Sequence, residues 1–219
     1  MLQGFKRHSY GFGRRFVHRA GAALMLFVAA GPAFAEQRLV LAYGDSLMAG
    51  YQLKPGEGFA PQLERALRAR GHDVRVVSAA VSGDTTAAGL QRLDWVLAGL
   101  KAKPDLVILG LGANDMLRGL PAAAAKRNLD TMIAAFRKRG AKVLVAGMLA
   151  PPNLGPAYQR AFNSMYPALA KRHGTPLYPF FMKGVVANRA LLLGDGMHPN
   201  PKGVAVIVRN IAPAVEAAL

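Results

Sequence analysis

The sequence predicts a doubly wound α/β fold, in which helices cover both faces of a parallel β-sheet. Two features of the chain predict it. Short, unbroken apolar runs recur along it, as expected of parallel strands that are buried on both faces. Between these runs lie longer segments whose apolar residues repeat every three or four positions, which is typical of amphipathic helices. Regular alternation of the two patterns favours right-handed β-α-β units within one sheet.

The apolar runs predict the strands, and the periodic segments predict the helices. We expect strands, in chain order, at Leu39–Tyr43, Val74–Ser78, Leu106–Leu111 and Val143–Gly147, with a weaker fifth near Pro176–Tyr178. The helical stripes are Leu63, Leu67 and Arg70 after Phe59; Leu90, Leu93, Leu97 and Leu100; Leu129, Met132, Ile133 and Phe136; Phe162, Met165, Tyr166 and Leu169; and Val204, Ile207, Val208, Ile211 and Val215. Asn200 and Pro201 mark the start of the last helix, because asparagine caps helices and proline fits the first helical position.

The first 35 residues predict a cleavable export signal. An uncharged run over residues 20–35 ends in the small-x-small sequence Ala33-Phe34-Ala35, and it follows five basic residues, Lys6, Arg7, Arg14, Arg15 and Arg19. The run is shorter than the roughly 20 apolar residues that span a bilayer, so an uncleaved anchor is the less favoured alternative. We expect residues 36–219 to form a single domain in the periplasm or outside the cell.

Composition excludes several classes of function. The chain has no cysteine, so thiolate catalysis, thiolate metal sites and disulfide bonds are excluded. It has 28 Lys and Arg residues against 12 Asp and Glu, and loss of the five basic leader residues would lower its net charge from +16 to +11. No nucleic-acid motif accompanies this charge, so we expect no nucleic-acid partner. Peripheral contact with an anionic membrane surface or envelope polymer is the favoured interpretation, and a solvated basic surface is the alternative.

Candidate chemical groups follow the predicted strands. Ser46 follows the first strand, Gly83 the second and Asn114 the third, and ligands of an open parallel sheet bind at the carboxyl ends of its strands. Asp195 and His198 stand just before the last helix, which should run antiparallel to the strands and begin above the same edge. We therefore expect these five separated residues to meet at one site.

Serine, histidine and aspartate are together the groups of a serine hydrolase. Ser46 would attack an acyl carbonyl, His198 would take its proton and return it to the leaving group, and Asp195 would orient the imidazole. The backbone N–H groups of Ser46 and Gly83 and the side-chain amide of Asn114 would bind the oxyanion. Each residue alone has a simpler interpretation as a turn or cap residue, and it is their joint arrangement that favours catalysis.

The motifs around these residues resemble the SGNH, or GDSL, hydrolase superfamily, whose four named residues would be Ser46, Gly83, Asn114 and His198. The similarity is greatest to the bacterial thioesterase I, arylesterase and lysophospholipase group and covers nearly all of residues 36–219. It is carried by Gly44–Tyr51, Gly112–Gly119, Pro151–Asn153, Pro179–Met182 and Asp195–Pro199. The resemblance implies a flavodoxin-like three-layer sandwich of about five parallel strands, and hydrolysis of esters and thioesters without a metal or other cofactor. Met48 and Ala88 depart from the usual pattern, and Met48 lies close enough to Ser46 to alter acyl preference.

Apolar residues crowd the loops beside the predicted site. Met116, Leu117, Met148, Leu149 and Pro151 are the candidates for a substrate groove, and Phe180, Phe181 and Met182 either add to it or belong to the core. Such a groove would bind the acyl chain of a small-molecule or lipid ester, such as a medium-chain aryl ester, an acyl thioester or a lysophospholipid. We expect the protein to be a monomer.

Two other functions on the same scaffold stay open. A carbohydrate O-deacetylase predicts a polar cleft lined by aromatic residues, whereas Trp95, the single tryptophan, lies within a helix stripe. A non-catalytic lipid-binding protein predicts no turnover that depends on Ser46. A flavodoxin-like carrier is disfavoured, because Leu47-Met48-Ala49 lacks the hydroxyl groups of a phosphate-binding loop.

Overall fold

The computed structural model describes residues 37–219 and, before them, only positions 1, 4, 6, 8 and 11. The chain divides into two units, Met1–Phe34 and Ala35–Leu219, and the second carries the helices and strands described below. The export signal predicted over residues 1–35 lies almost wholly outside the described residues and stays a prediction. Within the part of the chain that the structure describes, no helix is both long and apolar enough to cross a membrane.

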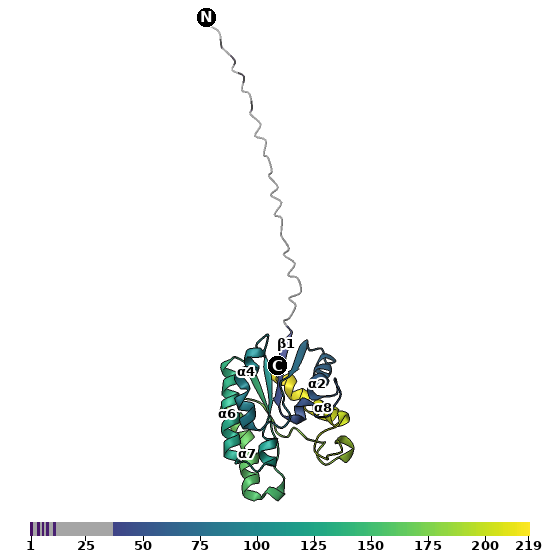
Figure 1. The fold of residues 1–219 in the computed structure, drawn as a ribbon. Helices are drawn as coiled ribbons and strands as arrows, with labels where there is room; N and C mark the ends of the chain where they lie inside the picture. The colour runs from purple at the N-terminus through teal and green to yellow at the C-terminus, as the bar shows by residue number, and fades with distance from the viewer. Residues whose placement is uncertain (2–3, 5, 7, 9–10, 12–36) are drawn as a thin grey trace. The chain divides into compact units, whose positions relative to one another are not determined.

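A parallel sheet of five strands forms the centre of the second unit (Figure 1). Its strands are β1 (Arg38–Gly44), β2 (Val74–Ser78), β3 (Leu106–Gly110), β4 (Lys142–Ala146) and β5 (Leu177–Tyr178). They pair in the order β2-β1-β3-β4-β5, which is the flavodoxin-like order. All five predicted strands are present, and their ends differ from the expected ones by at most one residue. The predicted fold class is confirmed.

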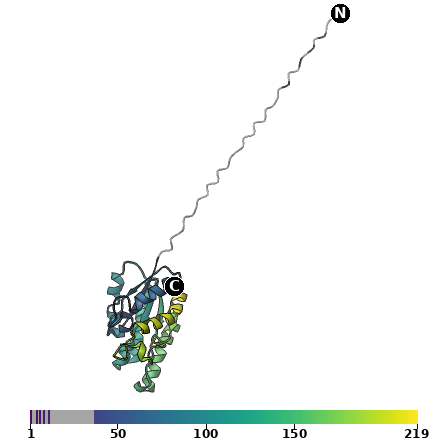
Figure 2. The ribbon, with the colours of Figure 1, turned by 90° about the vertical axis from the view of Figure 1, so that its right-hand side faces the viewer.

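Helices cover both faces of the sheet. On one face lie α2 (Phe59–Arg68) and α8 (Pro201–Ala218), and Figure 2 views the molecule from this side, with α8 in yellow. On the other face lie α4 (Leu93–Gly99), α6 (Ala122–Lys138) and α7 (Pro156–His173) (Figure 1). Side chains of a strand alternate between faces, so Val40 and Ala42 enter the first core while Leu41 and Tyr43 enter the second. The result is the three-layer sandwich.

One predicted helix is two helices. The stripe from Leu90 to Leu100 is divided at Arg92 into α3 (Thr86–Gln91) and α4. Arg92 caps the end of α3 and the start of α4, and its side chain reaches back to the carbonyl oxygens of Gly44 at the end of β1 and Ala79 after β2. Trp95 also departs from the expectation, because its side chain is 79% exposed on α4 and takes no part in the buried stripe.

The loops at the carboxyl ends of the strands carry four short helices. These are α1 (Ser46–Ala49) after β1, α5 (Ala113–Leu117) after β3, and the 3₁₀ turns η1 (Pro152–Leu154) and η2 (Arg189–Leu191). The chain leaves β1 toward β2 on one side and then crosses back to β3 on the other, so the crevice of this fold lies between the ends of β1 and β3. Ser46 and Asn114 lie at that crevice.

Candidate active site

A tight turn at the end of β1 places Ser46 at the first position of α1. Asp45 caps this helix, since its Oδ1 atom accepts a hydrogen bond from the N–H of Leu47 at 3.1 Å. Gly44 makes the turn possible, because a Cβ there would lie 2.6 Å from the sulfur of Met48 and 2.9 Å from the carbonyl oxygen of Gly110. The N–H of a first helical residue has no acceptor within its helix, so the Ser46 N–H is available to a ligand.

A second turn positions Asp195 and His198 before α8. Asp195 Oδ1 accepts hydrogen bonds from the N–H groups of Met197 at 2.9 Å and His198 at 3.0 Å, and Oδ2 lies 2.6 Å from His198 Nδ1. These bonds, led by the one from the His198 N–H, lower the pKa of Asp195 to about 2. The carboxylate stays ionised and therefore fixes the orientation of the imidazole through its Nδ1 atom. Asn200 then caps α8 by accepting from the N–H groups of Lys202 and Gly203.

The two turns meet at the serine. His198 Nε2 lies 2.9 Å from Ser46 Oγ, although the two residues are 152 positions apart. A carboxylate at Nδ1 favours the tautomer with the proton on that nitrogen, which leaves Nε2 as an acceptor for the serine hydroxyl. The structure thus forms a continuous hydrogen-bonded chain from Asp195 through His198 to Ser46.

Hydrogen-bond donors surround the serine. The side chain of Asn114 donates one of its two N–H bonds to the carbonyl oxygen of Asp84 at 2.9 Å and keeps the other for a ligand. Gly83 adopts a φ of +87°, a conformation that glycine tolerates best, and its carbonyl oxygen accepts a hydrogen bond from Arg118 at 2.9 Å. Asn114 lines the same pocket as Ser46 and His198, whereas Gly83 lies one residue away from the carbonyl that Asn114 binds.

An ion pair and several hydrogen bonds hold the loops that carry Gly83 and Asn114, and most of these contacts were not predicted from the sequence. Arg92 Nε lies 2.6 Å from Asp84 Oδ2, and its other nitrogens donate to the carbonyl oxygens of Ala79 and Gly44. Asp115 accepts from the backbone and hydroxyl of Thr86, at 2.7 and 2.6 Å. An arginine inside an apolar helical stripe is the one signal that could have indicated the first of these contacts.

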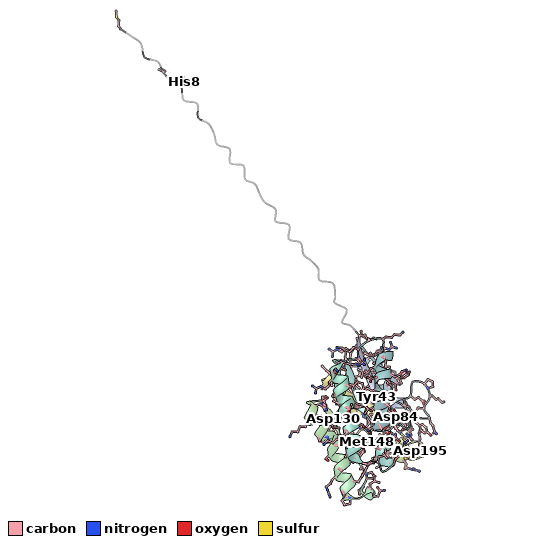
Figure 3. The ribbon with its side chains drawn as sticks, turned by 60° about the vertical axis from the view of Figure 1, so that its left-hand side comes forward. His8, Tyr43, Asp84, Asp130, Met148 and Asp195 are labelled. Atoms are coloured by element: carbon pink, nitrogen blue, oxygen red, sulfur yellow. The ribbon has the colours of Figure 1, made fainter. Side chains whose placement is uncertain are left out.

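An apolar pocket of about 260 Å³ opens beside the serine. It is lined by Ser46, Leu47, Ala113, Asn114, Met116, Leu117, Met148, Met182, Val186, Gly196, Met197 and His198. Of the predicted groove residues, Met116, Leu117 and Met148 line it, as does Met182, while Phe181 is buried in the core. Figure 3 labels Met148 together with Asp84 and Asp195, which come from the segments after β4, β2 and β5.

The predicted roles of Leu149 and Pro151 in substrate binding stay predictions, because the pocket beside Ser46 is lined by other residues. Neither residue lines it, and Leu149 is 44% exposed. After Met148 the backbone turns toward α7, where the N–H of Ala150 donates to Asn163 and its carbonyl oxygen accepts from Gln159. These bonds tie the residue between Leu149 and Pro151 to α7. Larger hollows exist, and one of about 570 Å³ lies at the opposite edge of the sheet beside Lys142 and Pro176, away from the serine.

Comparison with known proteins agrees with this geometry. Residues 42–206 match the GDSL-like Lipase/Acylhydrolase family. The chain belongs to this family. This GDSL acylhydrolase is 40% identical over 182 residues to "Esterase TesA" of Pseudomonas aeruginosa, which covers 83% of the chain and 90% of the relative. It is 38% identical over 190 residues to "Arylesterase" of Vibrio mimicus, which covers 87% of the chain and 94% of the relative.

Two further similarities extend the comparison. The GDSL acylhydrolase is 35% identical to "Thioesterase 1/protease 1/lysophospholipase L1" of Escherichia coli (strain K12), over 77% of each chain. The solved "Crystal Structure of TesA" superposes with a TM-score of 0.78 at 40% identity, over 83% of this chain and all of the other. The protein is therefore a serine ester hydrolase.

Proposed function

We propose that the protein hydrolyses carboxylic esters through an acyl-enzyme on Ser46. The observation that carries this proposal is the hydrogen-bonded chain in which His198 Nε2 lies 2.9 Å from Ser46 Oγ and His198 Nδ1 lies 2.6 Å from Asp195. As Oγ bonds to the carbonyl carbon, its proton passes to Nε2, and the resulting imidazolium is stabilised by the Asp195 carboxylate. The same proton then moves to the departing alkoxide or thiolate, and water repeats the sequence to release the acid.

The oxyanion would be bound by three donors. These are the N–H of Ser46, the N–H of Gly83 and the free N–H bond of Asn114. Each is held by backbone geometry or by a partner in the protein before substrate arrives. Donors that need no reorganisation stabilise charge that develops in the transition state, and one such donor contributes about 3–4 kcal/mol.

The substrates we propose are esters with a medium-length acyl chain. Leucine, methionine and valine side chains line most of the pocket, and each methylene buried there contributes roughly 0.8 kcal/mol to binding. The relatives named esterase, arylesterase and thioesterase/lysophospholipase support aryl esters, acyl thioesters and lysophospholipids as the classes to test. The apolar lining, and the position of Trp95 outside it, argue against a carbohydrate deacetylase.

Export and membrane contact complete the proposal. A leader cleaved after Ala35 would place the enzyme in the periplasm or outside the cell, where cytosolic acyl-coenzyme A is absent. Three apolar side chains that line the pocket are more than half exposed, namely Leu117, Val186 and Met197. Together with a net charge of +11 for residues 36–219, they support peripheral contact of the pocket mouth with an anionic lipid surface.

Hydrolysis of p-nitrophenyl esters from acetate to palmitate, with the Ser46→Ala variant as control, tests the function. We expect activity that is highest at intermediate chain lengths and lost in the variant, because the nucleophile is gone. Activity confined to acetate would favour a deacetylase. Equal turnover by the variant would contradict the proposal, and absence of turnover in both proteins would favour a lipid-binding role.

A further inference from the structure

The ring of Tyr51 packs against the imidazole of His198. The two ring centroids lie 4.4 Å apart at an interplanar angle of 38°, so a face of the phenol ring is turned toward the histidine. Tyr51 is 39% exposed, so the contact lies at the surface of the site and not in the core. Tyr51 ends the motif Gly44–Tyr51 but takes no part in the hydrogen-bonded chain from Asp195 through His198 to Ser46.

Tyr51 lies on the turn that directly follows the helix of Ser46. Helix α1 ends at Ala49, and the next residue, Gly50, caps it with a φ of 77°. The N–H groups of both Gly50 and Tyr51 point to the carbonyl oxygen of Ser46. The position of the Tyr51 ring is therefore coupled to that of the nucleophile. Residues 46–51 thus supply both the serine that lies at Nε2 of the imidazole and the aromatic ring that packs against the imidazole face.

The backbone after Tyr51 adopts an unusual conformation. Gln52 has a φ of 56° and is, among residues 37–219 and the few described before them, the one non-glycine residue with a positive φ. Its side-chain amide donates to the Tyr51 hydroxyl at 3.1 Å. Such conformations persist where the surrounding structure enforces them and are common at functional sites. Here the strained residue, Gln52, directly follows Tyr51 and binds its hydroxyl group.

We propose that Tyr51 is a positioning residue for the general base, an inference that rests on the proposed catalytic role of Ser46 and His198. Contact with the phenol ring keeps the imidazole in line with Ser46 Oγ while Asp195 holds its other nitrogen. When His198 accepts the serine proton it becomes a cation, and the π-electrons of a ring within about 6 Å attract that cation. The ring therefore stabilises the transition state of acylation more than the bound ester.

Substitution at Tyr51 separates this role from simple packing. Tyr51→Phe keeps the ring and loses the hydroxyl, whereas Tyr51→Leu keeps apolar contact and loses the π-electrons. With p-nitrophenyl butyrate we expect Tyr51→Leu to lower kcat about 10-fold with KM unchanged within about twofold. Tyr51→Phe should keep kcat within about threefold of the wild-type value. Trp95→Leu, which removes an exposed aromatic ring outside the pocket, is the matched control and should leave both constants unchanged.

A wild-type kcat in Tyr51→Leu would overturn the inference, and so would a loss of kcat in Tyr51→Phe as large as in Tyr51→Leu. A rise in KM at constant kcat would also overturn it, because it would place Tyr51 in substrate binding. If thermal unfolding shows that Tyr51→Leu does not fold, Tyr51→Met, which supplies a flexible apolar side chain without a ring, takes its place. Ser46→Ala, assayed in parallel, distinguishes the two proposals, since undiminished turnover by that variant would contradict the acyl-enzyme itself.

Discussion

At the scale of single residues, burial gives Asp45 a pKa very different from that of Asp195. Asp195 lies at the surface, where three hydrogen bonds stabilise its carboxylate. Asp45 is only 2% exposed, and this burial raises its pKa to about 7, against the opposing effect of the hydrogen bond from Leu47. Burial disfavours a charge, while N–H donors favour it. The two aspartates flank the serine and the histidine, yet only Asp195 is in contact with the imidazole.

The raised pKa of Asp45 predicts a dependence of stability on pH. The folded protein retains the Asp45 proton up to about pH 7, whereas the unfolded chain loses it near the ordinary aspartate pKa of 3.8. Folding is thus disfavoured by this group as the pH rises from about 4 to 7. Asp45→Asn keeps an oxygen for the Leu47 N–H and removes the charge. We expect its free energy of unfolding to exceed that of the wild type at pH 7.5, by on the order of 1 kcal/mol or more, and to approach it at pH 4.5.

Urea denaturation at the two pH values checks this prediction. Asp94→Asn is the matched control, because the side chain of Asp94 is 93% exposed and its charge is already solvated. The control should leave the pH dependence unchanged. Equal pH dependence in wild type and Asp45→Asn would show that Asp45 is ionised in the folded protein throughout this range.

At the scale of elements, one arginine joins the loop after β2 to the end of β1. Arg92, between α3 and α4, binds Asp84 in the loop after β2, the carbonyl oxygen of Ala79 and that of Gly44 at the end of β1. Its guanidinium also lies 4.1 Å from the centroid of the Tyr43 ring. Since Asp84 also binds Asn114 through its carbonyl oxygen, Arg92 supports the oxyanion donors and the serine turn together. The interruption of the helix at Arg92 is thus part of the construction of the site.

Removal of Arg92 should lower the free energy of unfolding substantially. Arg92→Met leaves the nearly buried carboxylate of Asp84 without its partner, and loss of one member of such a pair costs about 3–5 kcal/mol. Arg68→Met is the matched control, because the pair of Arg68 with Glu64 lies at the surface and is worth less than about 1 kcal/mol. The free energy of unfolding in urea measures both. Adding Asp84→Asn to Arg92→Met should recover part of the loss, and similar effects of the two arginine variants would contradict this account.

At the scale of the whole molecule, the path of the loops defines the pocket. The segment after β4 supplies Met148 to the pocket and then turns toward α7, whereas the segment after β5 supplies Met182 and Val186. Substrate selection therefore depends on residues far apart in the sequence. Two exposed leucines, one inside the pocket lining and one outside it, make this dependence testable.

Leu117→Arg and Leu149→Arg should differ in their effect on chain length. Both leucines are exposed, at 62% and 44%, but only Leu117 lines the pocket. A guanidinium at position 117 would oppose burial of the distal methylenes, so we expect kcat/KM for octanoate to fall about 10-fold relative to acetate. Leu149→Arg should leave this ratio within about twofold of the wild-type value. A series of p-nitrophenyl esters measures the ratio, and equal effects of the two variants would contradict the assignment of the pocket.

The overall charge predicts binding to anionic membranes. Residues 36–219 should sediment with vesicles that contain phosphatidylglycerol and not with vesicles of pure phosphatidylcholine. Binding should weaken in about 0.5 M salt, because ions screen the attraction between exposed charges. Val186→Ser, at the pocket mouth, should reduce sedimentation, whereas Trp95→Ser, outside the pocket, should not. Equal sedimentation with both lipids would exclude an electrostatic contact.

Much of the fold and of the candidate site can be predicted from the sequence, because the signals that indicate them are local. Buried parallel strands are short apolar runs, so all five strands are identified to within one residue. Because each strand of a doubly wound sheet ends at the same edge, the order of Ser46, Asn114 and His198 along the chain is enough to predict that they lie close together. Sequence similarity adds the family, and with it ester hydrolysis.

Contacts across the fold are decided only by the tertiary structure. Nothing in the sequence distinguishes Leu117 from Leu149, and the place of Arg92 in an apolar stripe does not reveal its partners, because these environments depend on where distant loops come to lie. The contact between Tyr51 and His198 likewise joins two turns 147 residues apart, so no local sequence pattern predicts it. The sequence by itself determined the order of the elements and the chemical groups, because periodicity and motifs are encoded locally. Tertiary structure decided which side chains support those groups and line the pocket, because packing depends on the whole chain.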